Sequence, residues 1–289
     1  MAKNILVTGS KGQLGQKVKD VLDTFSDINV VYTDVEELDI TSRRSAESVF
    51  QTVKPEIVIN CSAYTAVDKA ETEKETALKV NQKGPLILAE KCLQHDAFLI
   101  HVSTDYVFSG EGFKPYLENE PTKPVNFYGE TKVLGEEAIQ QTFNNFIIIR
   151  TAWLYSEHGN NFVKTMLRLG KERQKLGVID DQVGSPTYAG DLAIAIGEIV
   201  KYNLEKKDFS RGMYHFANEG VCSWFDFALK IQELAGNDVV VNPIPTTDYP
   251  TPAKRPHYSV LSKRKLKSEF HIDIPHWEES LKRCLDLLT

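Results

Sequence analysis

Ile5-Leu6-Val7-Thr8-Gly9-Ser10-Lys11-Gly12-Gln13-Leu14-Gly15 is the stretch that decides the fold. A short apolar run leads directly into glycines at three-residue spacing, and apolar residues then recur at helical spacing through Leu22. This order predicts a strand, a glycine loop and a helix, whose N-terminus offers NH groups and a positive dipole to a pyrophosphate. A tight turn without a ligand is the alternative. As the first βα turn, the motif favours a dinucleotide site formed by Gly9, Lys11, Gly12, Gln13, Leu14 and Gly15.

A second strand, predicted at 28–32, leads to a carboxylate at Asp34. An acidic residue about 20 positions beyond the glycines can hydrogen-bond an adenosine ribose, which favours NADH over NADPH. Lys11 favours NADPH instead, because an ammonium in the glycine loop can pair with a 2′-phosphate. The choice between NADPH and NADH therefore stays open. Asp39 and Ile40 are expected beside the adenine, with a loop cap as an equal alternative for Asp39.

The strand predicted at 54–60 ends in the small residues that precede Tyr64 and Thr65. Ligands of open α/β sheets bind at the carboxyl ends of the strands, and small side chains there leave room for them. We therefore expect Ala63, Tyr64 and Thr65 to contact the cofactor.

A catalytic set is predicted from the next strand, 98–102, and a helix expected over 124–143. Thr104 follows the strand and is expected to hydrogen-bond a substrate carbonyl oxygen. Tyr128 and Lys132 stand four residues apart, so they share one helix face. An ammonium beside a phenol stabilises the phenolate and lowers its pKa from about 10, so Tyr128 is expected to act as general acid while Lys132 holds the nicotinamide ribose. The alternatives are a solvated helix pair and a hydroxyl that only caps a turn.

Composition limits the possible partners. The chain has 289 residues, 42% hydrophobic and 26% charged, with a net charge of −6 and no basic stripe, so nucleic acid is not an expected partner. The short basic cluster 263–265 is interpreted as a solvated helix face. The four cysteines are scattered, and neither a leader nor a membrane-length apolar run is evident. These features predict a cytoplasmic protein without membrane contact, and the histidine spacing predicts no metal site.

The predicted fold is a Rossmann-type doubly wound parallel sheet with a smaller C-terminal substrate-binding lobe. Residues 1–152 and about 175–202 are assigned to the nucleotide domain, and 153–174 and 203–289 to the lobe. Trp153 follows a strand end, where it either stacks on a sugar or packs in the core. Arg255 lies between prolines and is expected to pair with a diphosphate through its planar fork. Trp224 and Phe227 are assigned to the core.

Three motifs together resemble the extended short-chain dehydrogenases/reductases, which act largely on nucleotide sugars. They are the glycines of the first loop, Ser103-Thr104-Asp105, and Tyr128-x-x-x-Lys132. Further stretches at 60–71, 103–108, 150–155 and 181–187 extend the resemblance over nearly the whole chain. It implies reduction of dTDP-4-dehydro-β-L-rhamnose to dTDP-β-L-rhamnose by NADPH or NADH. It also implies that Thr104, Asp105, Trp153 and Arg255 contact the nucleotide sugar, in a monomer or homodimer.

Two alternatives remain open at this point. Related 4,6-dehydratases typically carry Thr-Asp-Glu, whose acids remove water, whereas this chain has Thr104-Asp105-Tyr106 and lacks that proton acceptor. Another epimerase or dehydratase is the nearest alternative enzyme. The second alternative is a non-catalytic role, because the regulatory β subunit of methionine adenosyltransferase resembles these reductases.

Overall fold

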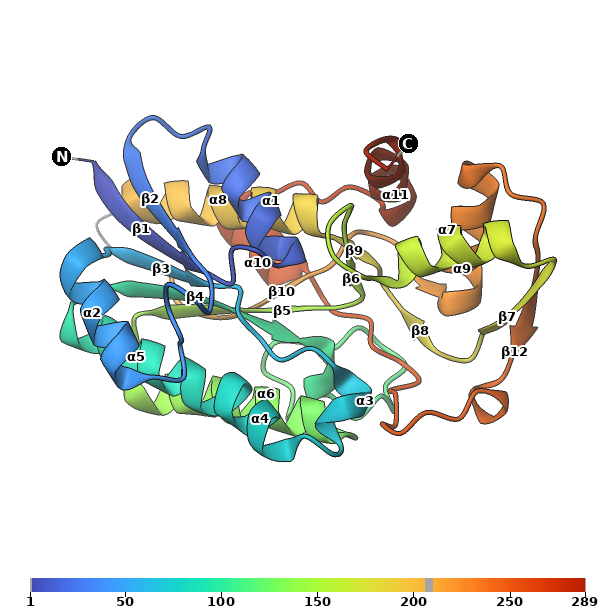
Figure 1. Cartoon of the computed structure of the whole chain (residues 1–289), viewed down its shortest axis with the longest axis horizontal. Coiled ribbons are helices and arrows are strands. Elements are labelled where there is room, and N and C mark those ends of the chain that lie inside the picture. Colours follow the sequence, from blue (N-terminus) through green and yellow to red (C-terminus); the bar gives the residue numbers. More distant parts are fainter. Residues whose placement is uncertain (1, 206–209, 289) are drawn as a thin grey trace.

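A six-stranded parallel sheet forms the centre of the computed structural model, which describes residues 2–205 and 210–288 (Figure 1). The strand order is β10-β5-β4-β3-β1-β2, and every neighbouring pair is parallel. The order reverses beside β1, which places the topological switch point between β1 and β3. The predicted Rossmann-type sheet is confirmed. Its strands are β1 (Lys3–Thr8), β2 (Ile28–Thr33), β3 (Ile57–Asn60), β4 (Phe98–Thr104), β5 (Phe146–Thr151) and β10 (Gly212–Phe216).

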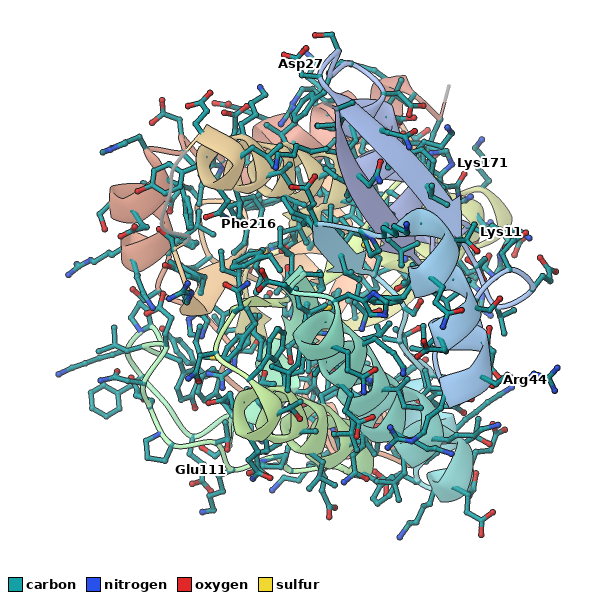
Figure 2. The ribbon with its side chains drawn as sticks, turned by 90° about the vertical axis from the view of Figure 1, so that its left-hand side faces the viewer. Lys11, Asp27, Arg44, Glu111, Lys171 and Phe216 are labelled. Carbon is teal, nitrogen blue, oxygen red and sulfur yellow. The ribbon has the colours of Figure 1, made fainter. Side chains whose placement is uncertain are left out.

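Both faces of this sheet are buried, which explains the continuous apolar runs. In β1, Ile5 and Val7 belong to one core cluster and Leu6 to the other, because successive side chains of a strand point to opposite faces. In Figure 2, Phe216 of β10 lies inside the molecule, whereas Lys11 and Arg44 project from the molecular surface.

Helices cover the two faces of the sheet. One face carries α1 (Gln13–Leu22), α8 (Ala189–Glu205) and α10 (Arg264–Phe270). The other carries α2 (Arg43–Val53), α5 (Gly84–Gln94) and α6 (Phe127–Thr142). Shorter elements lie along the carboxyl edge of the strands: α3 (Val67–Ala70), α4 (Lys74–Leu78), the π-helical turn η1 (Lys79–Lys83) and η2 (Asp105–Val107). No helix in the described residues is long and apolar enough to cross a membrane.

A second lobe has its own core beside the sheet, at the right of Figure 1. It contains α7 (Phe162–Glu172), α9 (Trp224–Ala235), α11 (Trp277–Asp286) and three two-stranded sheets. The pairs are β7 (Lys175–Ile179) with β12 (Val240–Ile244), β8 (Val183–Gly184) with β11 (Cys222–Ser223), and β6 (Leu154–Tyr155) with β9 (Thr187–Tyr188). The turn η3 (Thr246–Asp248) follows β12.

Two predicted boundaries are corrected by this pairing. The strand at 175–179 was assigned to the nucleotide domain, but it is β7 and pairs with β12 in the second lobe. Residues 212–216 were assigned to the substrate lobe, but they form β10, the edge strand of the central sheet. The apolar residues of 175–179 predict a strand without revealing its partner, since pairing is decided by tertiary packing. Residues 206–209 and 289 of the predicted lobe lie outside the described residues.

The catalytic helix candidate, α6, begins later than the predicted 124–143. Asn126 is its N-cap, and its side chain accepts a hydrogen bond from the amide of Gly129 at 2.8 Å. Pro124 therefore precedes the helix. Gly129 is required at this turn, because a Cβ there would lie 2.2 Å from the carbonyl oxygen of Tyr106.

An ion pair inside the protein joins α6 to the sheet. Arg150 on β5 donates to Glu136 on α6 through Nη2 at 2.6 Å and Nε at 3.0 Å, and the two side chains are 4% and 3% exposed. A guanidinium in this position depends on its carboxylate, since a buried charge without a partner is strongly unfavourable.

We predict that Glu136→Gln lowers the free energy of unfolding by about 3–5 kcal/mol, because it leaves Arg150 buried without a counter-charge. Urea denaturation followed by circular dichroism measures this loss. Glu137→Gln is the matched control, since Glu137 is exposed on the same helix. Equal stability of the two variants would contradict the assignment of Glu136 as the anchor.

Candidate active site

The glycine loop packs directly against the end of β3. Gly9 has φ +68°, and a Cβ on it would lie 2.7 Å from the amide nitrogen of Ser62. A Cβ on Gly15 would lie 2.1 Å from the carbonyl oxygen of Gly9. Only glycine fits either position, so the loop presents bare backbone at the switch point between β1 and β3.

A hollow of about 450 Å³ opens beside this loop. Seven of the predicted cofactor residues line it: Gly9, Lys11, Gly12, Asp34, Asp39, Ile40 and Ala63. Its wall combines glycines and other small residues with apolar side chains and two carboxylates, at the place where a dinucleotide binds such sheets. The residues present fit the adenosine half of a nicotinamide dinucleotide.

The carboxylate of Asp34 is held by main-chain amides. Its Oδ2 accepts from the amide of Lys11 at 3.0 Å, and its Oδ1 accepts from the amide of Val35 at 2.9 Å. The ammonium of Lys11 pairs with Glu36 at the surface. Asp39 caps a turn, since its Oδ1 accepts from the amide and hydroxyl of Thr41.

The remaining cofactor candidates do not line the hollow. Gln13 accepts hydrogen bonds from Ser156 and Asn161, so it joins the glycine loop to the second lobe. Leu14 is buried in the core. Tyr64 is tied to Asn81 of η1, whose amide oxygen accepts from the Tyr64 amide at 2.8 Å, and Thr65 accepts from the amide of Val67.

Thr104 and Tyr128 meet at the carboxyl end of β4. Thr104 and Asp105 both act on the pKa of the Tyr128 phenol, and the Thr104 hydroxyl donates to Asp105 Oδ1 at 3.0 Å. Tyr106 packs edge-on against the Tyr128 ring, with centroids 5.6 Å apart. A phenol, a hydroxyl and a carboxyl group thus lie together at this strand end.

The predicted electrostatic effect on Tyr128 is wrong for the free protein. Burial raises the pKa of Tyr128, and the charge of Asp105 adds to the increase while the Thr104 hydrogen bond opposes it. Lys132 lies beneath the site, where its Nζ donates to the carbonyl of Val102 at 2.8 Å. Burial lowers the pKa of Lys132 to about 8. Desolvation therefore outweighs the attraction on which the prediction relied.

Asp105 is buried, and Trp153 and Ser259 both lie against Gly184. Burial raises the pKa of Asp105 to about 6, while hydrogen bonds from Ser259 and Thr104 favour its ionised form. A Cβ on Gly184 would lie within 2.8 Å of both Ser259 and the Trp153 ring. Trp153 itself stacks on Trp224 with centroids 3.6 Å apart, and Phe227 is buried, as predicted.

Arg255 lies at the edge of the same site, already paired. Its guanidinium donates to both oxygens of Asp68, at 2.5 and 2.8 Å, and the pKa of Arg255 is raised by Asp68 and to a smaller extent by Tyr106. Tyr106 contacts Tyr128, so Arg255 is linked to the catalytic residues through one aromatic side chain.

Sequence reasoning missed two buried polar residues behind Lys132. His101 lies within an otherwise apolar strand, and Asn60 ends β3; both are 0% exposed. The amide of Asn60 is 2.9 Å from His101 Nδ1, and His101 Nε2 is 3.4 Å from Lys132 Nζ. A polar residue inside an apolar run is a detectable signal, because buried polar groups require partners.

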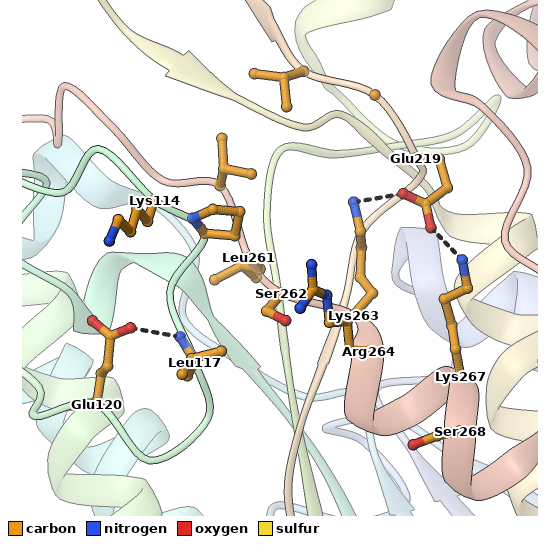
Figure 3. A pocket seen from close by; sticks show the side chains of 14 residues that line it. Lys114, Leu117, Glu120, Glu219, Leu261, Ser262, Lys263, Arg264, Lys267 and Ser268 are labelled. Atoms are coloured by element: carbon orange, nitrogen blue, oxygen red, sulfur yellow. Dashed lines mark hydrogen bonds and ion pairs between the residues drawn. The ribbon is translucent and has the colours of Figure 1, made fainter.

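A larger hollow, about 960 Å³, lies away from these groups (Figure 3). Its cations are Lys114, Lys263, Arg264 and Lys267. The predicted solvated face is wrong at Lys263, which is 9% exposed. Glu219 bridges Lys263 at 3.2 Å and Lys267 at 2.8 Å, so much of the positive charge is already balanced.

One group of possible metal ligands occurs in the described residues: Asp20, Glu157 and His158, whose ligand atoms lie within 4.8 Å of one another. Lys17 Nζ contacts Asp20 at 2.8 Å and Glu157 at 2.7 Å. An ammonium therefore already balances these two carboxylates.

Comparison with known proteins gives a consistent result. Residues 3–289 match the family described as RmlD substrate binding domain. The chain is 42% identical over 284 residues to a dTDP-4-dehydrorhamnose reductase of Aggregatibacter actinomycetemcomitans, covering 96% of this chain and 97% of that protein. The crystal structure of a dTDP-4-dehydrorhamnose reductase from Clostridium acetobutylicum superposes with a TM-score of 0.92 at 43% identity, covering 99% of each chain.

A second crystal structure, of dTDP-4-dehydrorhamnose reductase from Bacillus anthracis in complex with NADP, has a TM-score of 0.91 at 38% identity, covering 99% of this chain and 100% of that one. These matches extend over the sheet and the second lobe together. The chain therefore belongs to the RmlD family, the family of the dTDP-4-dehydrorhamnose reductases that it resembles over nearly its whole length.

Proposed function

We propose that this protein reduces dTDP-4-dehydro-β-L-rhamnose to dTDP-β-L-rhamnose with NADPH or NADH. The observation that carries the proposal is the placement of Thr104 beside Tyr128 above a buried Lys132, at the carboxyl edge of a sheet whose glycine loop fits a dinucleotide. Full-length identity of about 40% to dTDP-4-dehydrorhamnose reductases supports the choice of sugar.

The residues of this chain would position a carbonyl and supply its proton. Thr104 would hold the C4 oxygen, and Tyr128 would donate a proton to it as negative charge develops. A raised phenol pKa keeps Tyr128 protonated at neutral pH, which suits an acid in the direction of reduction. When bound, the reduced nicotinamide supplies the hydride.

Around this centre, three further residues would bind the nucleotide sugar. Asp105 would accept from a sugar hydroxyl, Trp153 would contact the ring, and Arg255 would share its guanidinium between Asp68 and the diphosphate. Gly9, Lys11, Gly12 and Asp34 would hold the dinucleotide, with Lys132 on the nicotinamide ribose. We further propose a cytoplasmic monomer or homodimer, in keeping with four free cysteines.

We predict that Tyr128→Phe lowers kcat by about 10²–10⁴-fold while cofactor still binds, because only the proton donor is lost. NAD(P)H oxidation with the 4-keto sugar nucleotide measures the rate. Tyr32→Phe is the control, since the Tyr32 phenol on β2 donates to Asp23 at the end of α1 and does not line the hollow. Equal turnover by the Tyr128 variant would remove it from the mechanism, and product formation without net NAD(P)H consumption would favour an epimerase or dehydratase.

We predict that Asp34→Asn raises the affinity for NADPH relative to NADH by about tenfold, because it removes a carboxylate that repels a 2′-phosphate. Cofactor fluorescence titration gives both dissociation constants. Asp27→Asn, on the exposed turn before β2, is the control for a lost charge. An unchanged ratio would show that Asp34 does not face the adenosine ribose.

We predict that Arg255→Lys raises KM for the nucleotide sugar about tenfold with little change in kcat, since lysine cannot share a bidentate fork. Steady-state kinetics at saturating cofactor separate the two constants. The neighbouring exposed cation is tested by Lys254→Met, which should leave KM unchanged. A loss confined to kcat would contradict a binding role.

A further inference from the structure

The amide of Asn60 has only one possible orientation. Its Oδ1 accepts from the backbone amide of Ser62 at 3.0 Å and from the hydroxyl of Thr8 at 2.7 Å. A backbone N–H can only donate, so the atom facing Ser62 must be the amide oxygen. The NH₂ group of Asn60 is therefore the one that faces His101 Nδ1 at 2.9 Å.

This orientation fixes the tautomer of His101. Nδ1 must accept from Asn60, so it carries no proton. The imidazole is neutral, because Nδ1 is an acceptor and burial lowers the pKa of His101 well below its usual value. The single ring proton consequently lies on Nε2, the atom that faces Lys132 Nζ at 3.4 Å.

A donor in this position disfavours an ammonium. Lys132 Nζ already donates to Val102, and an NH₃⁺ group has no lone pair to accept the Nε2 proton, whereas a neutral amine does. The other titratable groups around this site do not offset the effect. Glu136, one turn along α6, acts to raise the pKa of Lys132 but is paired with Arg150, and the charge of Asp105 acts on Tyr128.

We propose that Asn60 and His101 tune the protonation of Lys132: His101 directs its Nε2–H at the lysine nitrogen and shifts the equilibrium from the ammonium toward the neutral amine in the free protein. His101 is thus a positioning residue that acts through Lys132. The role in reduction rests on the proposed function, but the hydrogen-bond geometry does not. Lys132 then exchanges a proton more readily than an exposed lysine does.

The tautomer is measured directly in the protein without cofactor. In a two-bond ¹H–¹⁵N correlation spectrum, the ring-nitrogen shifts distinguish the two neutral forms, and the His101 signals are those absent from His101→Gln. We expect an Nε2–H tautomer that persists from pH 6 to pH 8, in contrast to exposed histidines with a pKa of about 6.5. An Nδ1–H tautomer or a protonated ring in this range would overturn the proposal.

The effect on Lys132 is measured with ¹⁵Nζ-labelled lysine, using Lys132→Met to identify its signal. Asn60→Ala frees Nδ1, allows Nε2 to accept, and is expected to raise the ammonium-to-amine ratio of Lys132 about tenfold at a fixed pH. Asn60→Asp should move it further in the same direction. Asn29→Asp, an exposed change on β2, should leave it unchanged.

An unchanged Lys132 titration in a folded Asn60→Ala variant would refute the proposal. If that variant fails to fold, the tautomer of His101 in the wild-type protein still tests the proposal. The activity assay separates the two proposals: an active reductase with the opposite tautomer refutes only the role of His101, and an inactive protein with the expected tautomer refutes only the reaction. A merely structural His101 would affect activity equally at all pH values without moving the pH profile.

Discussion

The docking of α6 against β4 is the contact on which the candidate site depends. Lys132 Nζ reaches back to the carbonyl of Val102, and the Glu136–Arg150 pair fixes the same helix one turn further along. These two anchors set the height of Tyr128 above the strand, where Thr104 meets it. A shift of one turn, about 5.4 Å, would separate the two hydroxyls completely.

Burial changes the electrostatics that a helical i, i+4 pair suggests. Tyr128 and Lys132 lie on the same face, but both are removed from water, and each is pushed toward its neutral form. A protonated phenol is the form required for donating to a developing alkoxide. The site is therefore arranged for the reductive direction before any ligand enters.

Much of this organisation is readable from the sequence because it depends on local patterns. The glycine loop, the apolar strands and the Thr104, Tyr128 and Lys132 set obey short-range rules of spacing and periodicity. The pairing of β7 with β12 was not readable, since it joins segments about 60 residues apart through the core of the second lobe. The Asp68 partner of Arg255 and the network behind Lys132 are likewise long-range, and they became visible only when β3, β4 and the second lobe were placed together.

Gly184 is a position at which this protein does not tolerate substitution. The two side chains that a Cβ there would strike, Trp153 and Ser259, come from separate segments of the chain. Even alanine would displace an aromatic ring and a serine hydroxyl simultaneously. Redesigned versions of this protein should therefore hold residue 184 constant.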